Sequence, residues 1–84
     1  SQAIDLVKPI YPPLAHKMGA QGKVVVQVTI DEKGKVISAK ATEGNSALRE
    51  VSEAAARRST FKPALWNDKP IKATGSVIYN FKAN

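Results

Sequence analysis

The segment Pro70-Ile-Lys-Ala-Thr-Gly-Ser-Val-Ile-Tyr-Asn-Phe-Lys82 sets the architecture of this 84-residue chain. Side chains on a β-strand alternate between its two faces, so the segment predicts a long strand with one buried and one mainly polar face. The predicted buried face carries Ile71, Ala73, Val77, Tyr79 and Phe81. A strand at the end of a chain can lie at a sheet edge, where its unpaired backbone groups are open to a second chain.

Two more strands are predicted upstream, over residues 23–30 and 35–42. In the first, Val24 opens a regular apolar alternation that continues to Ile30. Asp31-Glu-Lys-Gly34 has the residues of a tight turn, so the two strands form a β-hairpin. The alternation of the second strand is interrupted, which indicates a β-bulge near Ile37-Ser38.

Two helices are predicted around this hairpin. A short helix covers Leu14 to Met18, after prolines that suit a first turn and before Gly19, a favoured residue just past a helix end. A longer helix begins after a cap at Asn45 or Ser46 and ends before Lys62-Pro63. Its predicted apolar stripe consists of Leu48, Val51, Ala54 and Ala55.

The predicted order is therefore short helix, strand, strand, helix, strand. This order indicates an α+β domain, in which a three-stranded antiparallel sheet carries two helices on one face. Ile4, Leu6 and Val7 can add a short N-terminal strand, and Phe61 and Trp66 are expected to pack over the sheet. We expect residues 1–9 to be the end of a linker or an N-terminal arm, and residues 10–84 to be the domain.

The residue inventory argues against an enzyme, a metal protein and a cofactor-binding protein. There is no Cys, and the one His, His16, has no neighbouring nucleophile or base in the sequence. The carboxylates are few and dispersed, with no metal-ligand spacing, and no Gly-rich phosphate loop is present. We therefore expect no catalytic residues, no metal site and no cofactor.

The chain is basic, with a formal net charge of +6 and a sequence pI near 9.9. Such a balance is typical of proteins that bind polyanions, but it also keeps a small domain soluble when the charges are dispersed, as they are here. The middle strands carry Val and Ala where an RNA-binding sheet would carry aromatic residues, so no nucleic-acid partner is expected.

The ordered motifs of the chain resemble the C-terminal domain of TonB proteins. The resemblance extends from about Tyr11 to the end of the chain. It is carried by Tyr11-Pro12, Gly19, Gln21-Gly22, Asp31 with Gly34, the Ala-rich helix, Phe61-Lys-Pro63, Lys69-Pro70 and Phe81.

This resemblance implies a periplasmic energy-transducing domain that binds the TonB box of outer-membrane receptors and enables uptake of iron–siderophores, haem or cobalamin. The parent protein would carry an inner-membrane anchor, associated with ExbB and ExbD, and a linker before Ser1. The TonB box would add as a strand beside the last strand of the domain. The expected contact residues are Ile71, Lys72, Ala73, Thr74, Gly75, Ser76, Val77, Ile78, Tyr79 and Asn80.

Tyr11 and Pro12 form an expected second contact with the partner, although Tyr11 can instead pack against the first helix. Two other functions remain open: a TonB-like or TolA-like envelope scaffold or sensor with a different protein partner, and a basic module that binds a polyanion. A free strand edge also allows a homodimer to form by strand exchange.

Overall fold

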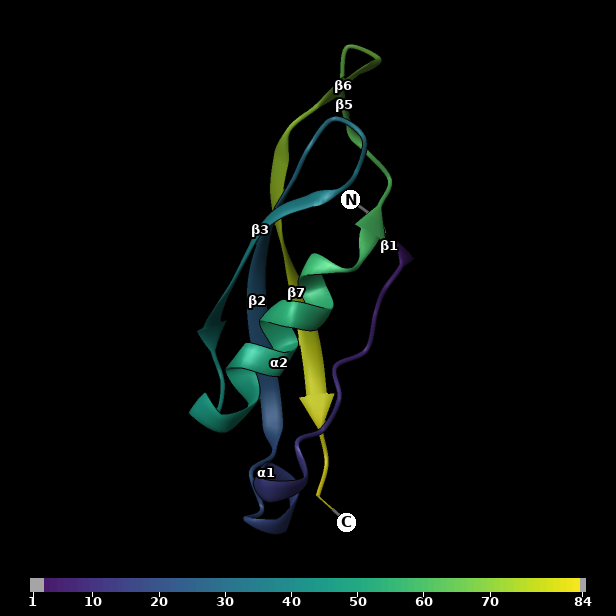
Figure 1. The fold of residues 1–84 in the computed structure, drawn as a ribbon. Helices are drawn as coiled ribbons and strands as arrows, with labels where there is room; N and C mark the ends of the chain where they lie inside the picture. Colours follow the sequence, from purple (N-terminus) through teal and green to yellow (C-terminus); the bar gives the residue numbers. More distant parts are fainter. Residues whose placement is uncertain (1–2, 84) are drawn as a thin grey trace.

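Three antiparallel strands form the central sheet in the order β3-β2-β7 (Figure 1). The structure is a computed structural model that describes residues 3–83. The strands are β2 (Gly22–Ile30), β3 (Val36–Glu43) and β7 (Ala73–Phe81). Strands β2 and β7 pair without interruption from Gly22 opposite Phe81 to Ile30 opposite Ala73. The α+β class and the predicted antiparallel sheet are confirmed.

The β2–β3 hairpin contains the predicted bulge. Thr29 lies opposite Ser38, whereas Ile30 lies opposite Val36, so Ile37 is the extra residue on β3. In the turn, Asp31 accepts hydrogen bonds of 2.9 Å from the main-chain N–H groups of Lys33 and Lys35. The bond from Lys35 is the main cause that lowers the pKa of the Asp31 carboxyl.

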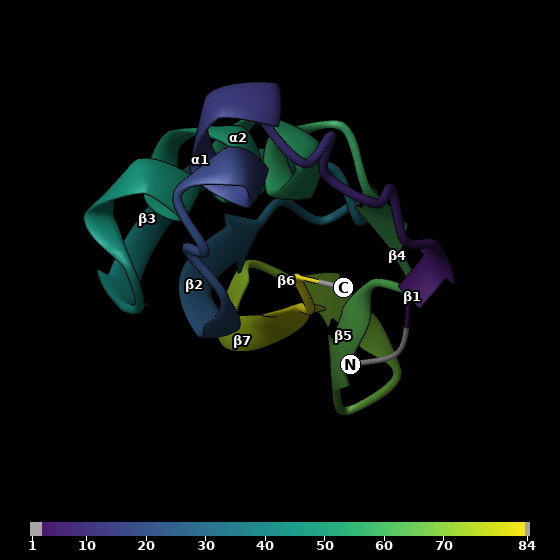
Figure 2. The same cartoon turned by 90° about the horizontal axis from the view of Figure 1, so that it is seen from below.

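Both predicted helices form, and they lie on the same side of the sheet (Figure 2). The short helix α1 spans Pro13–Lys17, and Gly19 follows it with a φ of +76°. The longer helix α2 spans Ser46–Arg57. The side chain of Asn45 caps it by accepting a hydrogen bond of 2.8 Å from Ala47 N–H.

The hydrophobic core lies between α2 and one face of the sheet. Val77, Tyr79 and Phe81 of β7 are buried, and Ala73 is half-buried. The other main contributors are Val24, Val26, Val28, Ile30, Leu48, Ala55 and Ala56.

The stripe predicted for α2 was wrong at one position. Ala54 is exposed, whereas Ser52 and Ala56 are buried. Burial of Ser52 is tolerated because its hydroxyl donates a hydrogen bond of 2.7 Å to the Leu48 carbonyl within the helix. Because Ser52 is polar, it was left out of the predicted apolar stripe, and the stripe was placed part of a helical turn away from the buried face.

Four short strands lie outside the central sheet. A short N-terminal strand forms as β1 (Ala3–Asp5), which pairs with β4 (Thr60–Phe61). It contains Ile4 of the predicted segment, whereas Leu6 and Val7 lie beyond its end. Strands β5 (Ala64–Trp66) and β6 (Lys69–Ile71) form a hairpin. Its turn contains Asn67 and Asp68, both with positive φ, as tight two-residue hairpins require. This hairpin was not predicted.

The hairpin changes the placement of two residues from the sequence analysis. Trp66 is 68% exposed, so its predicted packing over the sheet was wrong; Phe61, in contrast, is buried. Ile71 belongs to β6 and lies opposite Ala64, so the long strand expected from Pro70 to Lys82 is divided at Lys72. The domain measures 48 × 20 × 16 Å, with the β5–β6 hairpin at one end and α1 at the other (Figure 1).

Candidate peptide-binding edge

Strand β7 has a free edge. It pairs with β2 on one side, and no other strand among residues 3–83 pairs with its opposite side. The opposite edge of the sheet, on β3, differs because its bulge breaks the row of backbone groups. Charged Lys40 and Glu43 are also exposed along β3. Of the two edges, only β7 offers a regular nine-residue template for another strand.

The hydrogen bonds of the β2–β3 turn indicate which backbone groups of β7 are free. Asp31 N–H donates to the Lys35 carbonyl at 2.8 Å, so the backbone of Asp31 points toward β3. Successive residues of a strand point their backbone groups to opposite sides, so Ile30 points toward β7. The regular register then turns Ala73, Gly75, Val77 and Tyr79 toward β2. The residues that face the free edge are Thr74, Ser76, Ile78 and Asn80.

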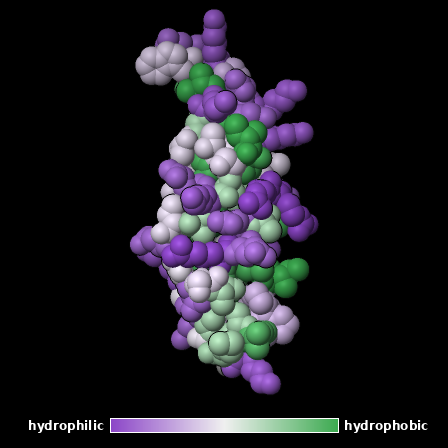
Figure 3. All heavy atoms as spheres, turned by 60° about the vertical axis from the view of Figure 1, so that its left-hand side comes forward, coloured by the Kyte–Doolittle hydropathy of each residue, from purple (hydrophilic) through white to green (hydrophobic). Residues whose placement is uncertain are grey.

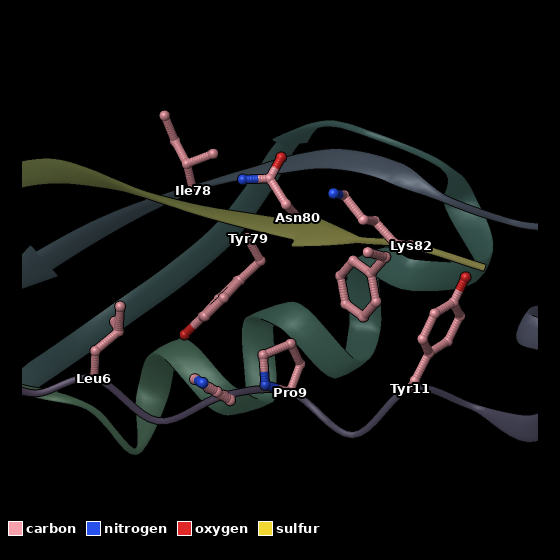
Figure 4. A pocket seen from close by; sticks show the side chains of 9 residues that line it. Leu6, Pro9, Tyr11, Ile78, Tyr79, Asn80 and Lys82 are labelled. Atoms are coloured by element: carbon pink, nitrogen blue, oxygen red, sulfur yellow. The ribbon is translucent and has the colours of Figure 1, made fainter. Parts of the chain in front are cut away.

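A groove of about 380 Å³ lies beside the C-terminal half of this edge (Figure 4). One wall is β7 and its continuation, residues 78–82, and the other is the N-terminal arm, which supplies Leu6, Lys8, Pro9 and Tyr11. Tyr79 points from the strand toward the arm, whereas Ile78, Asn80 and Lys82 lie on the other side of the ribbon (Figure 4). A strand that pairs with β7 would therefore place alternate side chains in the groove.

Two long-range hydrogen bonds hold the arm in place. Val7 N–H donates to the hydroxyl of Ser59 at 2.9 Å, and the Tyr79 hydroxyl donates to the Val7 carbonyl at 2.7 Å. Burial raises the pKa of Tyr79, so the phenol stays neutral and remains a donor. The arm is thus fixed both to Ser59, just after the end of α2, and to Tyr79 in β7.

Of the expected second contact, Tyr11 lines the groove, whereas Pro12 is not among its lining residues. Pro12 precedes the first turn of α1 as its N-cap. Tyr11 is half-buried: its ring packs edge-on against Phe81 and His16, at centroid distances of 5.1 and 4.9 Å, and its hydroxyl donates to the Ala20 carbonyl. Tyr11 therefore packs against the first helix region and also lines the groove.

The predicted contact residues are only partly brought together. Residues 73–80 share β7, whereas Ile71 pairs with β5 and Lys72 lies between the two strands. Sequence reasoning missed the arm residues Leu6, Lys8 and Pro9. The apolar side chain of Leu6 and the extended backbone at Pro9 were visible in the sequence, but nothing local indicated that the arm would lie beside β7.

The groove is basic and partly apolar. Lys8 and Lys82 line it, and none of its lining residues is acidic. Among residues 3–83, no cluster of three or more His, Cys, Asp or Glu side chains is suited to a metal ion. No helix in that range is long and apolar enough to span a bilayer.

Comparison with known families identifies the fold. The family model described as the Gram-negative bacterial TonB protein C-terminal matches residues 7–83. The chain belongs to the TonB C-terminal domain family. A comparison with curated proteins finds no match.

A solved TonB C-terminal domain has the same fold. The solution NMR structure of the Pseudomonas aeruginosa TonB C-terminal domain superposes with a TM-score of 0.72 at 22% sequence identity. The alignment covers 95% of this chain and 83% of that one. The TonB family match thus includes the last arm residues, both helices and the three strands of the central sheet.

Proposed function

We propose that this domain is the receptor-binding end of a periplasmic energy transducer, and that it binds the TonB box of outer-membrane receptors by strand addition. It would enable uptake of iron–siderophores, haem or cobalamin, with ExbB and ExbD coupled to the membrane-anchored part of the parent protein. Family membership supports the transducer class. The domain itself acts by binding and needs no catalytic residue.

The observation that carries the proposal is the regular free edge of β7 beside a groove. A partner segment in extended conformation would hydrogen-bond with the edge-facing backbone at Thr74, Ser76, Ile78 and Asn80. Because main-chain bonds do not depend on the partner's side chains, one domain can serve several receptors. The groove adds selectivity, since the partner's inward side chains must fit between Tyr79 and the arm.

The expected binding is weak and reversible. Each backbone hydrogen bond contributes a net ~0.5–1.5 kcal/mol, whereas association costs at least ~4 kcal/mol in lost freedom. A few hydrogen bonds and one buried apolar side chain therefore leave only a small favourable free energy of binding. Lys8 and Lys82 favour a partner with acidic residues and increase the association rate, an effect that added salt reduces.

A peptide titration tests the proposal. The isotope-labelled domain is titrated with TonB-box peptides of candidate receptors and with scrambled peptides of the same composition, while backbone amides are followed by NMR. We expect saturable shifts at residues 74–80 and along the arm for the TonB-box peptides alone.

Other outcomes would contradict it. No response at millimolar peptide would favour an envelope scaffold or sensor with another partner. Equal shifts with scrambled acidic peptides, lost steeply with salt, would favour a polyanion-binding module. Concentration-dependent shifts without peptide would indicate pairing of β7 edges in a homodimer.

A further inference from the structure

The β5–β6 hairpin leaves two large apolar side chains in solvent at one end of the molecule. Leu65 is 61% and Trp66 is 68% exposed, and neither belongs to the hydrophobic core. Leu65 lies opposite Pro70 and Trp66 lies opposite Lys69, so the two side chains project from opposite faces of the hairpin. Figure 3 shows hydrophobic atoms at this upper end, surrounded by hydrophilic side chains that extend into solvent. The fold itself therefore makes little use of either residue.

The base of the hairpin is firmly attached to the domain. Phe61, which precedes it, is buried, and its N–H donates to the Gly34 carbonyl at 2.9 Å. A Cβ atom at Gly34 would overlap the Phe61 carbonyl oxygen, so the two segments are in close contact. At the other end, Asn67 and Asp68 form the tight turn. Trp66 is thus presented in a defined position, which lowers the entropic cost of binding a partner.

The surroundings of these apolar residues are basic. Lys69 and Lys72 lie on or next to the hairpin, and Lys62 precedes it. Asp68 is the only acidic residue after Glu53 in the sequence. Trp66 shares its face of the hairpin with Lys69, so this face is complementary to an apolar patch bordered by carboxylates. Trp is also among the residues that most often dominate the energy of an interface.

The hairpin is continuous with the candidate peptide-binding edge, because Lys72 alone separates β6 from β7. We propose that the hairpin is a second docking surface for the same partner. It receives a folded, acidic part of the receptor's periplasmic face, while the receptor's extended segment pairs with β7. This inference rests on the proposed function, and it predicts that the intact receptor binds more tightly than its isolated peptide.

The test compares two ligands. The first is the TonB-box peptide that gives the largest shifts in the titration above, and the second is the purified receptor that contains it, in nanodiscs. Trp66→Ala should bind the receptor ~10-fold more weakly or worse, with peptide affinity within about twofold of wild type because no peptide contact reaches the hairpin. Ile37→Ala is the matched control, since Ile37 is 53% exposed on β3 at the opposite edge of the sheet.

A charge reversal makes the test independent of hairpin folding. Lys69→Glu should weaken receptor binding and reduce its salt dependence, whereas Lys40→Glu on β3 should not. Unchanged receptor affinity in both hairpin variants would overturn the proposal, as would an equal loss for the peptide. A change in the sedimentation of the Trp66→Ala domain alone would assign the hairpin to a contact between copies instead. If the wild-type domain binds the receptor but no TonB-box peptide, strand addition at β7 is wrong. The effects of the hairpin variants on receptor affinity still decide whether the hairpin is a docking surface.

Discussion

The Tyr79 hydroxyl donates a hydrogen bond of 2.7 Å to the main-chain carbonyl of Val7, 72 residues earlier in the chain. This bond joins the last strand to the N-terminal arm and so defines the width of the groove between them. The second tie, from Val7 N–H to Ser59, fixes the other side of the same peptide segment. These two hydrogen bonds therefore hold the groove open between the arm and β7, and substitutions that remove either bond should affect peptide binding.

Tyr79→Phe should lower the free energy of unfolding by about 1 kcal/mol, because it removes a net hydrogen bond and leaves the Val7 carbonyl unpaired. It should also weaken peptide binding, since the arm is released from β7. Urea unfolding and the peptide titration measure the two effects. Ser52→Ala is the control: it removes a buried hydroxyl that bonds within α2, away from the groove, and should leave peptide binding unchanged. Equal peptide affinity of Tyr79→Phe and wild type would contradict the role of the arm.

Stability should fall at alkaline pH through Tyr79. Burial raises its folded pKa above the ordinary value of 10.0, so its contribution is fully present below that pH. As pH rises through the folded pKa, the unfolded state releases its phenol proton more readily, and this contribution is lost. Urea midpoints measured across this range should decline less for Tyr79→Phe than for wild type. Parallel declines would show that other groups cause the loss.

Alanine substitutions at Gly34 and Gly19 distinguish the cost of steric overlap from the cost of backbone strain. Both have positive φ, but a Cβ at Gly19 meets nothing within 4 Å, whereas one at Gly34 overlaps the Phe61 carbonyl. Gly19→Ala should therefore cost only the strain of a left-handed residue, about 1–2 kcal/mol. Gly34→Ala should cost at least about 2 kcal/mol more, because overlap forces the backbone to shift. Similar unfolding free energies for the two variants would contradict the close contact between Gly34 and Phe61.

Proline substitutions distinguish the two sides of β7. Ser76→Pro removes an N–H that faces the free edge, so the domain should stay folded and lose peptide affinity. Gly75→Pro removes an N–H that faces β2, so it should destabilise the sheet by about 1–3 kcal/mol. Ser76→Ala controls for the lost hydroxyl. If Ser76→Pro remains folded and binds the peptide as tightly as Ser76→Ala, pairing along this part of the edge is wrong.

Local patterns in the sequence predicted the central sheet well. The alternation from Val24 to Ile30 and from Val77 to Phe81 reports burial on one face directly, and the broken alternation after Val36 located the bulge. Each of these features depends on neighbours along the chain, so no long-range information was needed. The cap at Asn45 was predictable for the same reason.

The β5–β6 hairpin and the groove were harder to predict from the sequence. Trp66 was expected to pack over the sheet, but two short strands with a turn at Asn67-Asp68 place it in solvent. The turn residues were the available signal for this hairpin. The groove depends on contacts such as Tyr79 with Val7 and Val7 with Ser59, which link distant segments and leave no periodic trace in the sequence.

Amide hydrogen exchange of β7 tests strand addition most directly. In the free domain, the amides of Gly75, Val77 and Tyr79 should be protected by β2, whereas those of Ser76, Ile78 and Asn80 should exchange rapidly. With a saturating TonB-box peptide, the second set should become protected and the first should remain so. If Ser76, Ile78 and Asn80 keep exchanging rapidly in the complex, or protection appears along β3 instead, the partner does not add to this edge.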